Sequence, residues 1–153
     1  MTIRTRTHRI VRVGGAGLML ALVPTLAACS AFSRSDVDYA RPYPFDAERQ
    51  DMLDVQVFRE GTKLKMTNTT AHAFGPSTLW VNQRFSRPID AFAPGETITL
   101  NLYDFRDQYQ DAFRAGGFFA TQEPDQVVLV ELQPGDEAGG KLYGFVVVKN
   151  EMN

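Results

Sequence analysis

The sequence predicts a mainly β protein: an antiparallel two-sheet sandwich of about seven strands, with one short helix near residues 103–115. Three observations lead to this fold class. Apolar and polar residues alternate with a period of two along most of the chain after Leu53, turn-forming residues separate the alternating stretches, and only one stretch has apolar residues at helical spacing. The length of the chain allows one core, so we expect a single domain over residues 53–150.

The first two strands are predicted to form a hairpin that turns at Gly61. Before the turn, Val55 and Val57 alternate with polar residues, and after it Leu64 and Met66 do the same. Alternation on both sides of a glycine is typical of a hairpin with one buried face.

The next strand is predicted over residues 77–85, STLWVNQRF, with side chains alternating between two faces. The core-facing set is Leu79, Val81 and Phe85. The other set is Trp80, Asn82 and Arg84. In the opposite phase Trp80 would be buried between the two sheets, and the pattern allows both orientations.

A further strand is predicted at residues 96–102, ETITLNL, after the turn at Pro94-Gly95. Ile98, Leu100 and Leu102 are expected to face the core.

The helix is predicted from residues 103–115, where apolar side chains recur at i, i+4, i+7 and i+8. These side chains are Phe105, Tyr109, Ala112 and Phe113. Asp104 is the expected N-cap, and Gly116-Gly117 would end the helix. We expect the next apolar pair, Phe118-Phe119, to begin a strand inside the core.

The last hairpin is predicted from residues 126–133 and 141–150, joined by a polar loop over 134–140. Both strands are apolar on both faces, which indicates central positions covered by the opposing sheet and by the helix. Gly144 inside the last strand indicates a bulge or a close approach of backbone.

The N-terminal residues have the pattern of an export signal. Four arginines and no acidic residue come first, and a mostly apolar run from Val13 to Leu26 follows. The arginines are Arg4, Arg6, Arg9 and Arg12. The apolar run is shorter than the roughly 20 residues of a membrane-spanning helix, so we expect residues 1–28 to be removed.

The only cysteine stands at the end of this leader, in Leu26-Ala27-Ala28-Cys29. This motif resembles the lipobox of bacterial lipoproteins. The resemblance implies cleavage between Ala28 and Cys29, a lipid on the cysteine sulfur, and membrane attachment through Cys29. Ser30 after the cysteine implies an outer-membrane lipoprotein that faces the periplasm.

Residues 29–52 are predicted to form an extended tether, because Pro42 and Pro44 favour extended predecessors. Tyr39, Tyr43 and Phe45 in this segment would dock either on the domain itself or on a partner. Residues 68–96, with Asn68-Thr69-Thr70 at a strand end and a later Pro-Gly-Glu turn, resemble immunoglobulin-like domains of bacterial envelope proteins. The cysteine pair of immunoglobulin domains is absent.

Charge excludes nucleic acid as an expected partner. The leader holds four of the 16 basic groups and none of the 18 acidic ones, so the remaining chain has 12 basic against 18 acidic groups, a net charge of −6. Nucleic-acid binding depends on a basic surface.

Few residues are suited to catalysis. His72 is the only histidine after the leader, and we expect it in a loop rather than in a nucleophilic triad. Asp104, Asp107 and Asp111 would share one helix face, where Arg114 would neutralise them, so we expect a solvated face and no metal site. No cofactor is expected.

The outward set of the third strand is the candidate binding strip: Trp80, Asn82, Arg84 and Arg87. Tryptophan and arginine are enriched at interface hot spots. The sequence therefore favours a non-enzymatic envelope lipoprotein that binds another envelope protein or a cell-wall glycan. Two alternatives remain at this stage, a small carboxylate-dependent hydrolase or glycan-acting enzyme, and a carrier of an apolar ligand.

Overall fold

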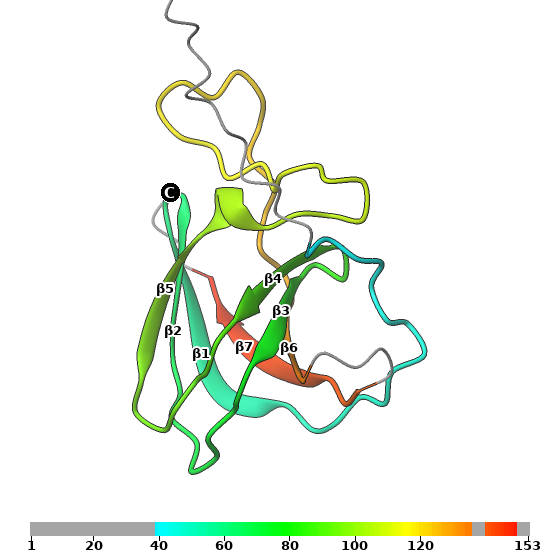
Figure 1. Cartoon of the computed structure of the whole chain (residues 1–153). Coiled ribbons are helices and arrows are strands. Elements are labelled where there is room, and N and C mark those ends of the chain that lie inside the picture. The colour runs from blue at the N-terminus through cyan, green and yellow to red at the C-terminus, as the bar shows by residue number, and fades with distance from the viewer. Residues whose placement is uncertain (1–38, 136–139, 150–153) are drawn as a thin grey trace, which may run out of the picture. The chain divides into compact units, whose positions relative to one another are not determined.

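The computed structural model describes residues 39–135 and 140–149, and these residues form seven strands and one 3₁₀ turn (Figure 1). The elements are β1 (Leu53–Glu60), β2 (Lys63–Thr67), β3 (Ser77–Val81), β4 (Phe85–Ile89), β5 (Thr97–Asn101), η1 (Leu102–Asp104), β6 (Val130–Pro134) and β7 (Tyr143–Val148). The predicted mainly β class is confirmed.

All seven strands belong to one mixed sheet in the order β4-β3-β6-β7-β1-β2-β5, which curls on itself (Figure 1). Neighbouring strands are antiparallel except β1 and β7, which are parallel. The predicted division into two sheets is not found in the described residues. A sandwich would separate the two halves of the sheet, whereas β7 pairs with β6 on one side and with β1 on the other.

The curl brings side chains from both halves of the sheet into one core. Val55, Val57, Leu64 and Met66 are all buried there, as the alternation predicted. Each such side chain contributes roughly 1.5–3 kcal/mol when it is fully buried. The first hairpin is therefore confirmed in both its pairing and its inward face.

Residues 77–85 contain a turn at 82–84 between β3 and β4 rather than one continuous strand, so the predicted strand is wrong beyond Val81. Asn82 and Gln83 have φ of 55° and 56°, and β4 returns antiparallel to β3 with Val81 opposite Phe85. Two successive residues with positive φ are typical of the type I′ hairpin turn. The even spacing of Val81 and Phe85 suggested one strand across the turn, although the polar Gln83 occupies an inward position between them.

The strand after Pro94-Gly95 is confirmed as β5, which pairs with β2. Leu100 and Leu102 are buried and Ile98 is partly buried, in the predicted phase.

The predicted helix at 103–115 is wrong. Only the short turn η1 forms, and its N-cap is Asn101, whose side chain accepts a hydrogen bond from the Tyr103 amide. Phe105 and Phe113 are buried as predicted, but Phe113 N–H donates to the Phe105 carbonyl across a looped-out segment. Their spacing of eight residues therefore spans a loop instead of two helical turns.

The side chain of Asp107 explains why this loop is not helical. Its Oδ1 accepts hydrogen bonds from the backbone amides of Tyr109 and Asp111, each at 2.9 Å. These amides are the donors that a helix would direct to backbone carbonyls. Gln110, with a φ of 70°, completes the turn.

The last hairpin is confirmed, with β6 and β7 antiparallel and central in the sheet, although β6 begins at Val130. Gly144 is a point of close approach, because a Cβ built there would lie 3.1 Å from Cγ of Met52. The contact is with a side chain rather than with backbone.

Residues 39–52 pack on the sheet, so Tyr43 docks on its own domain. Tyr43 and Ala47 form a small buried cluster with Trp80 and Leu142. This segment covers the outer face of β3 and β6, whereas the central strands were expected to be covered by an opposing sheet on one side and by the helix on the other.

Phe118 and Phe119 are 96% and 90% exposed in the loop before β6, so the prediction that they begin a core strand is wrong. No helix within residues 39–135 or 140–149 has the length and apolar character needed to span a bilayer.

Candidate binding surface

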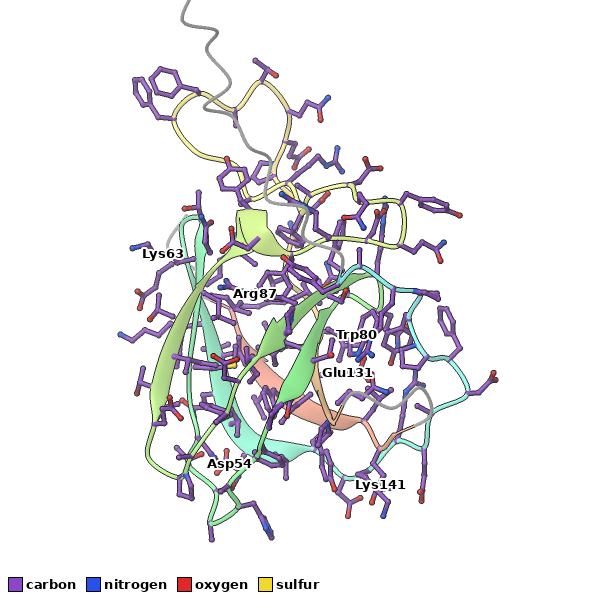
Figure 2. All side chains as sticks on the ribbon, in the orientation of Figure 1. Asp54, Lys63, Trp80, Arg87, Glu131 and Lys141 are labelled. Carbon is purple, nitrogen blue, oxygen red and sulfur yellow. The ribbon has the colours of Figure 1, made fainter. Side chains whose placement is uncertain are left out.

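Trp80, the centre of the predicted strip, is completely buried. Its ring packs edge-on against Tyr43 at 5.2 Å between centroids, and its Nε1–H donates to Oε1 of Gln133 at 3.0 Å. Figure 2 shows Trp80 and Glu131 on the side of β3 and β6 that the 39–52 segment covers. Of the two orientations left open by the sequence, the buried one is correct. Trp80 is covered by the 39–52 segment rather than by a second sheet.

Asn82 holds the turn of the β3–β4 hairpin against the chain that leads into β6. Its Nδ2 donates to the carbonyl of Gln126 at 2.6 Å, and its Oδ1 accepts from the amide of Val128 at 2.9 Å. Both contacts are internal to the fold.

Arg87 lies in β4 and forms an ion pair with Asp104, with Nη1 3.0 Å from Oδ2. Its side chain is mostly buried. The continuous outward face that the sequence predicted is therefore not formed by Trp80, Asn82 and Arg87.

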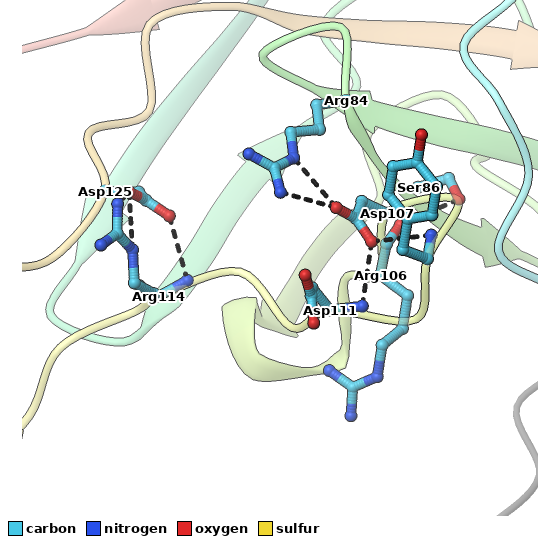
Figure 3. A network of polar contacts seen from close by, with 8 residues as sticks. Arg84, Ser86, Arg106, Asp107, Asp111, Arg114 and Asp125 are labelled. Carbon is cyan, nitrogen blue, oxygen red and sulfur yellow. Dashed lines mark hydrogen bonds and ion pairs between the residues drawn. The ribbon is translucent and has the colours of Figure 1, made fainter.

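Arg84 is the most exposed member of the strip, with 58% of its side chain exposed. Its Nε and Nη2 donate to Oδ2 of Asp107 at 3.0 and 2.7 Å (Figure 3). The guanidinium also lies over the ring of Phe85, 4.9 Å from the centroid. These contacts fix the position of an accessible cation.

The partner carboxylate, Asp107, is only 1% exposed. Burial by itself would raise the pKa of Asp107, but the hydrogen bonds from Arg84 and from the amides of Asp111 and Tyr109 outweigh it and lower the pKa below its usual value. Asp107 is therefore a charged centre that holds Arg84 and the surrounding loop together.

A second arginine lies nearby with the same kind of partner. Arg114 Nε donates to Oδ1 of Asp125 at 3.0 Å, and the backbone amide of Arg114 donates to Oδ2 at 3.3 Å (Figure 3). The hydrogen bond from Arg114 is the main reason that the pKa of Asp125 is lowered. A hollow of about 440 Å³ extends between Arg84 and Arg114, with Asp111 on its wall.

Another hollow, of about 340 Å³, also has Arg84 in its wall, and we call it the aromatic slot. It is lined by Pro42, Tyr43, Phe45, Gln83, Arg84, Asp107, Gln108 and Tyr109. Phe45 and Tyr109 are 72% and 75% exposed. Three segments far apart in the sequence therefore contribute to one hollow, in which exposed aromatic rings accompany a fixed guanidinium.

The predicted row of aspartates does not exist as a row. Asp104 pairs with Arg87 and Asp107 pairs with Arg84, while Arg114 binds Asp125 rather than Asp111. In the parts of the chain that the structure describes, no three acidic, histidine or cysteine side chains form a group that could hold a metal ion.

His72 is exposed in the turn after β2, as expected of a loop histidine. Its backbone carbonyl accepts a hydrogen bond from Nδ2 of Asn68 at 2.8 Å. Asn68 is buried directly after the end of β2, which confirms the predicted strand end. Ala28 and Cys29 lie outside the described residues.

Sequence reasoning missed Phe45 and Tyr109 as surface residues of one site. The available signal was the Pro42-Tyr43-Pro44-Phe45 sequence, where prolines restrict the backbone beside aromatic residues. No family model matches the chain, and neither the curated proteins nor the solved structures give a significant match.

Proposed function

We propose that this chain is an exported bacterial lipoprotein, anchored through Cys29 in the outer membrane and facing the periplasm, that binds another envelope protein without catalysing a reaction. The aromatic slot is the binding site. The lipobox motif of the leader supports the anchor, and the exposed aromatic residues beside Arg84 support the binding role.

The observation that carries the binding role is the combination of Phe45, Tyr109 and Arg84 in one hollow. Aromatic residues and arginine are the types that most often dominate interface energetics. The guanidinium of Arg84 is held by Asp107 and Phe85 before any partner arrives, which reduces the entropy lost on binding.

The chemistry of Arg84 indicates the kind of contact it offers. Two of its five N–H groups are engaged by Asp107 among the described residues, and its side chain is more than half exposed. The outer edge of the guanidinium can donate to a backbone carbonyl or a carboxylate of the partner. Apolar or proline side chains of that partner would pack against Phe45 and Tyr109.

The acidic side chains of this region favour binding over hydrolysis. Asp107 and Asp125 are each bound to an arginine, and their pKa values are lowered. A general acid in a carboxylate-dependent hydrolase would need a raised pKa.

Affinity purification from detergent-solubilised membranes tests this proposal. The double variant Phe45→Ser and Tyr109→Ser should lose a partner protein that the unaltered chain retains, because both rings are largely exposed and line the slot. Val128→Ser is the matched control, since Val128 is exposed outside the slot. Unchanged recovery in the double variant would contradict the proposal, and binding to isolated cell wall instead would identify a glycan as the ligand.

A further inference from the structure

The most exposed large apolar side chains of the described residues are adjacent in the chain. Phe118 and Phe119 are 96% and 90% exposed, and their rings meet edge-on at 5.0 Å between centroids. They lie in the loop that extends beyond η1, at the end of the domain drawn uppermost in Figure 1. Two neighbouring phenylalanines in water are unfavourable unless something covers them.

The base of this loop is fixed by several contacts. Arg59 Nη2 donates to the carbonyl of Ala115 at 2.7 Å, and a second N–H of Arg59 reaches the carbonyl of Asp125. The backbone amide of Asp125 donates to the carbonyl of Arg114 at 2.9 Å. The two ends of the loop are thereby held together, and the phenylalanines form its projecting tip.

The glycines before the tip allow this path. Gly116 and Gly117 have φ of 82° and 121°, which side chains rarely permit. The hydroxyl of Tyr103 also donates to the carbonyl of Gly116, so the loop is fastened to η1. The sequence Gly-Gly-Phe-Phe thus places two aromatic rings outside the fold by a defined backbone route.

Tyr39 lies beside the same turn. The hydroxyl of Tyr39 donates to the carbonyl of Asp104, the residue after Tyr103. Tyr39 is ten residues after Cys29, and an extended chain of that length spans at most about 35 Å. A lipid on Cys29 would therefore keep this end of the domain within about 35 Å of the membrane surface.

We propose that the Phe118-Phe119 tip is a second membrane contact, which inserts both rings into the interfacial region of the lipid bilayer. This inference rests on the proposed anchor at Cys29. The bilayer is the occupant that fits, because Tyr39, ten residues after the proposed anchor, is hydrogen-bonded at η1, which also holds the loop.

The contact is apolar rather than electrostatic. Glu123 and Asp125 are the nearest acidic residues in the chain after the tip, and Arg114 is bound to Asp125. Insertion of the rings should therefore occur in neutral phosphatidylcholine vesicles and should not weaken in salt, unlike binding by a basic patch.

Tryptophan fluorescence in vesicles tests this contact on the purified lipoprotein. Phe118→Trp places a reporter at the tip, while the native Trp80 is buried beneath the 39–52 segment and gives a constant background. In phosphatidylcholine vesicles with brominated acyl chains, the added tryptophan should be quenched. Tyr109→Trp is the matched control, since Tyr109 is equally a loop residue and exposed, and it should not be quenched.

A second measurement uses transfer of the lipoprotein between vesicles. Phe118→Ser with Phe119→Ser should accelerate transfer at least about tenfold, because two aromatic rings no longer have to leave the lipid. Equal quenching of the reporters at 118 and 109, or an unchanged transfer rate, would overturn the inference.

The anchor is measured separately by mass spectrometry of the peptide that contains Cys29. An acylated Cys29 without quenching at position 118 overturns the membrane contact and leaves the anchor standing. Quenching at position 118 on a chain whose Cys29 carries no lipid supports the contact and refutes the anchor.

Discussion

Asp107 is predicted to be the main polar support of the loop from residues 105 to 113. Its Oδ2 accepts two hydrogen bonds from Arg84, and its Oδ1 accepts the amides of Tyr109 and Asp111. The two oxygens therefore accept hydrogen bonds from different groups, and two substitutions separate their contributions to stability.

Asp107→Asn keeps an oxygen for the two amides and removes the ion pair with Arg84. Because Arg84 is more than half exposed and stays hydrated, we expect the free energy of unfolding to fall by about 1–2 kcal/mol. Asp107→Ala also leaves both amides without their acceptor, which should lower the free energy of unfolding further, by about 1–2 kcal/mol. The cost stays moderate because water can reach part of the loop.

Urea denaturation at pH 7 measures the free energy of unfolding of both variants. In thermal melting, Asp107→Asn and Asp107→Ala should lose roughly 4 and 10 °C in melting temperature. Asp111→Asn is the control, since the side chain of Asp111 is exposed, and it should change stability little. The reasoning is refuted if asparagine destabilises as much as alanine, or if neither variant differs from the control.

The lowered pKa of Asp107 also predicts how the stability of the chain depends on pH. The pKa of Asp107 is lower in the folded chain than its ordinary value of about 3.9, so its contribution is complete above that pH. As pH falls toward the lowered pKa, protonation removes the contribution. The difference in stability between the unaltered chain and Asp107→Asn should therefore shrink below about pH 4, and a constant difference down to pH 2 would contradict this assignment.

Three further predictions concern other parts of the chain. Gln83→Gly should raise the free energy of unfolding by about 0.5–1 kcal/mol, because Gln83 has a φ of 56° in a turn that favours glycine after Asn82; thermal melting measures this, and a lower melting temperature would argue against the turn. Tyr43→Phe should lower the same free energy by about 1–2 kcal/mol, because the buried Glu131 loses a hydrogen bond of 2.7 Å; denaturation without any change would show that the 39–52 segment does not depend on this bond. Cys29→Ser should abolish incorporation of radiolabelled fatty acid in growing cells, and labelling that persists would refute the lipobox assignment.

Local pattern predicted the parts of the fold that depend on neighbouring residues. The first hairpin, β5 and the β6–β7 hairpin follow from alternation and turn residues, and the structure contains all of them. The single curled sheet could not be predicted in this way, because the parallel pairing of β1 with β7 joins the two ends of the domain and leaves no periodic signal.

The two errors within the candidate site have related causes. Val81 and Phe85 on either side of the type I′ turn at Asn82-Gln83 keep the even spacing of a strand, so one strand was expected where the chain reverses, although the polar Gln83 interrupts the alternation. Phe105 and Phe113 are spaced as on a helix, but the carboxylate of Asp107 binds the amides that a helix requires. In both places the spacing of the apolar residues indicated the wrong element, and backbone dihedrals or side-chain hydrogen bonds decided the structure.

The aromatic slot depends on tertiary structure and could not be seen in the sequence. Phe45 comes from the segment expected to be a tether, Arg84 from the hairpin turn, and Tyr109 from the segment expected to be a helix. The sequence contains each of these residues but does not show that they are neighbours. Docking of the 39–52 segment on β3 and β6 brings the three together.

Photocrosslinking in intact cells tests the binding role of the aromatic slot most directly. A photoreactive amino acid placed at Tyr109 should give a crosslinked product with one envelope protein, and the same product should be lost when Arg84→Ala is added. The same amino acid at Lys63, which is exposed on β2 and is not part of the slot, should not give it. The account predicts a product at Tyr109 that depends on Arg84, whereas the same product from Lys63, or none from Tyr109, would contradict it.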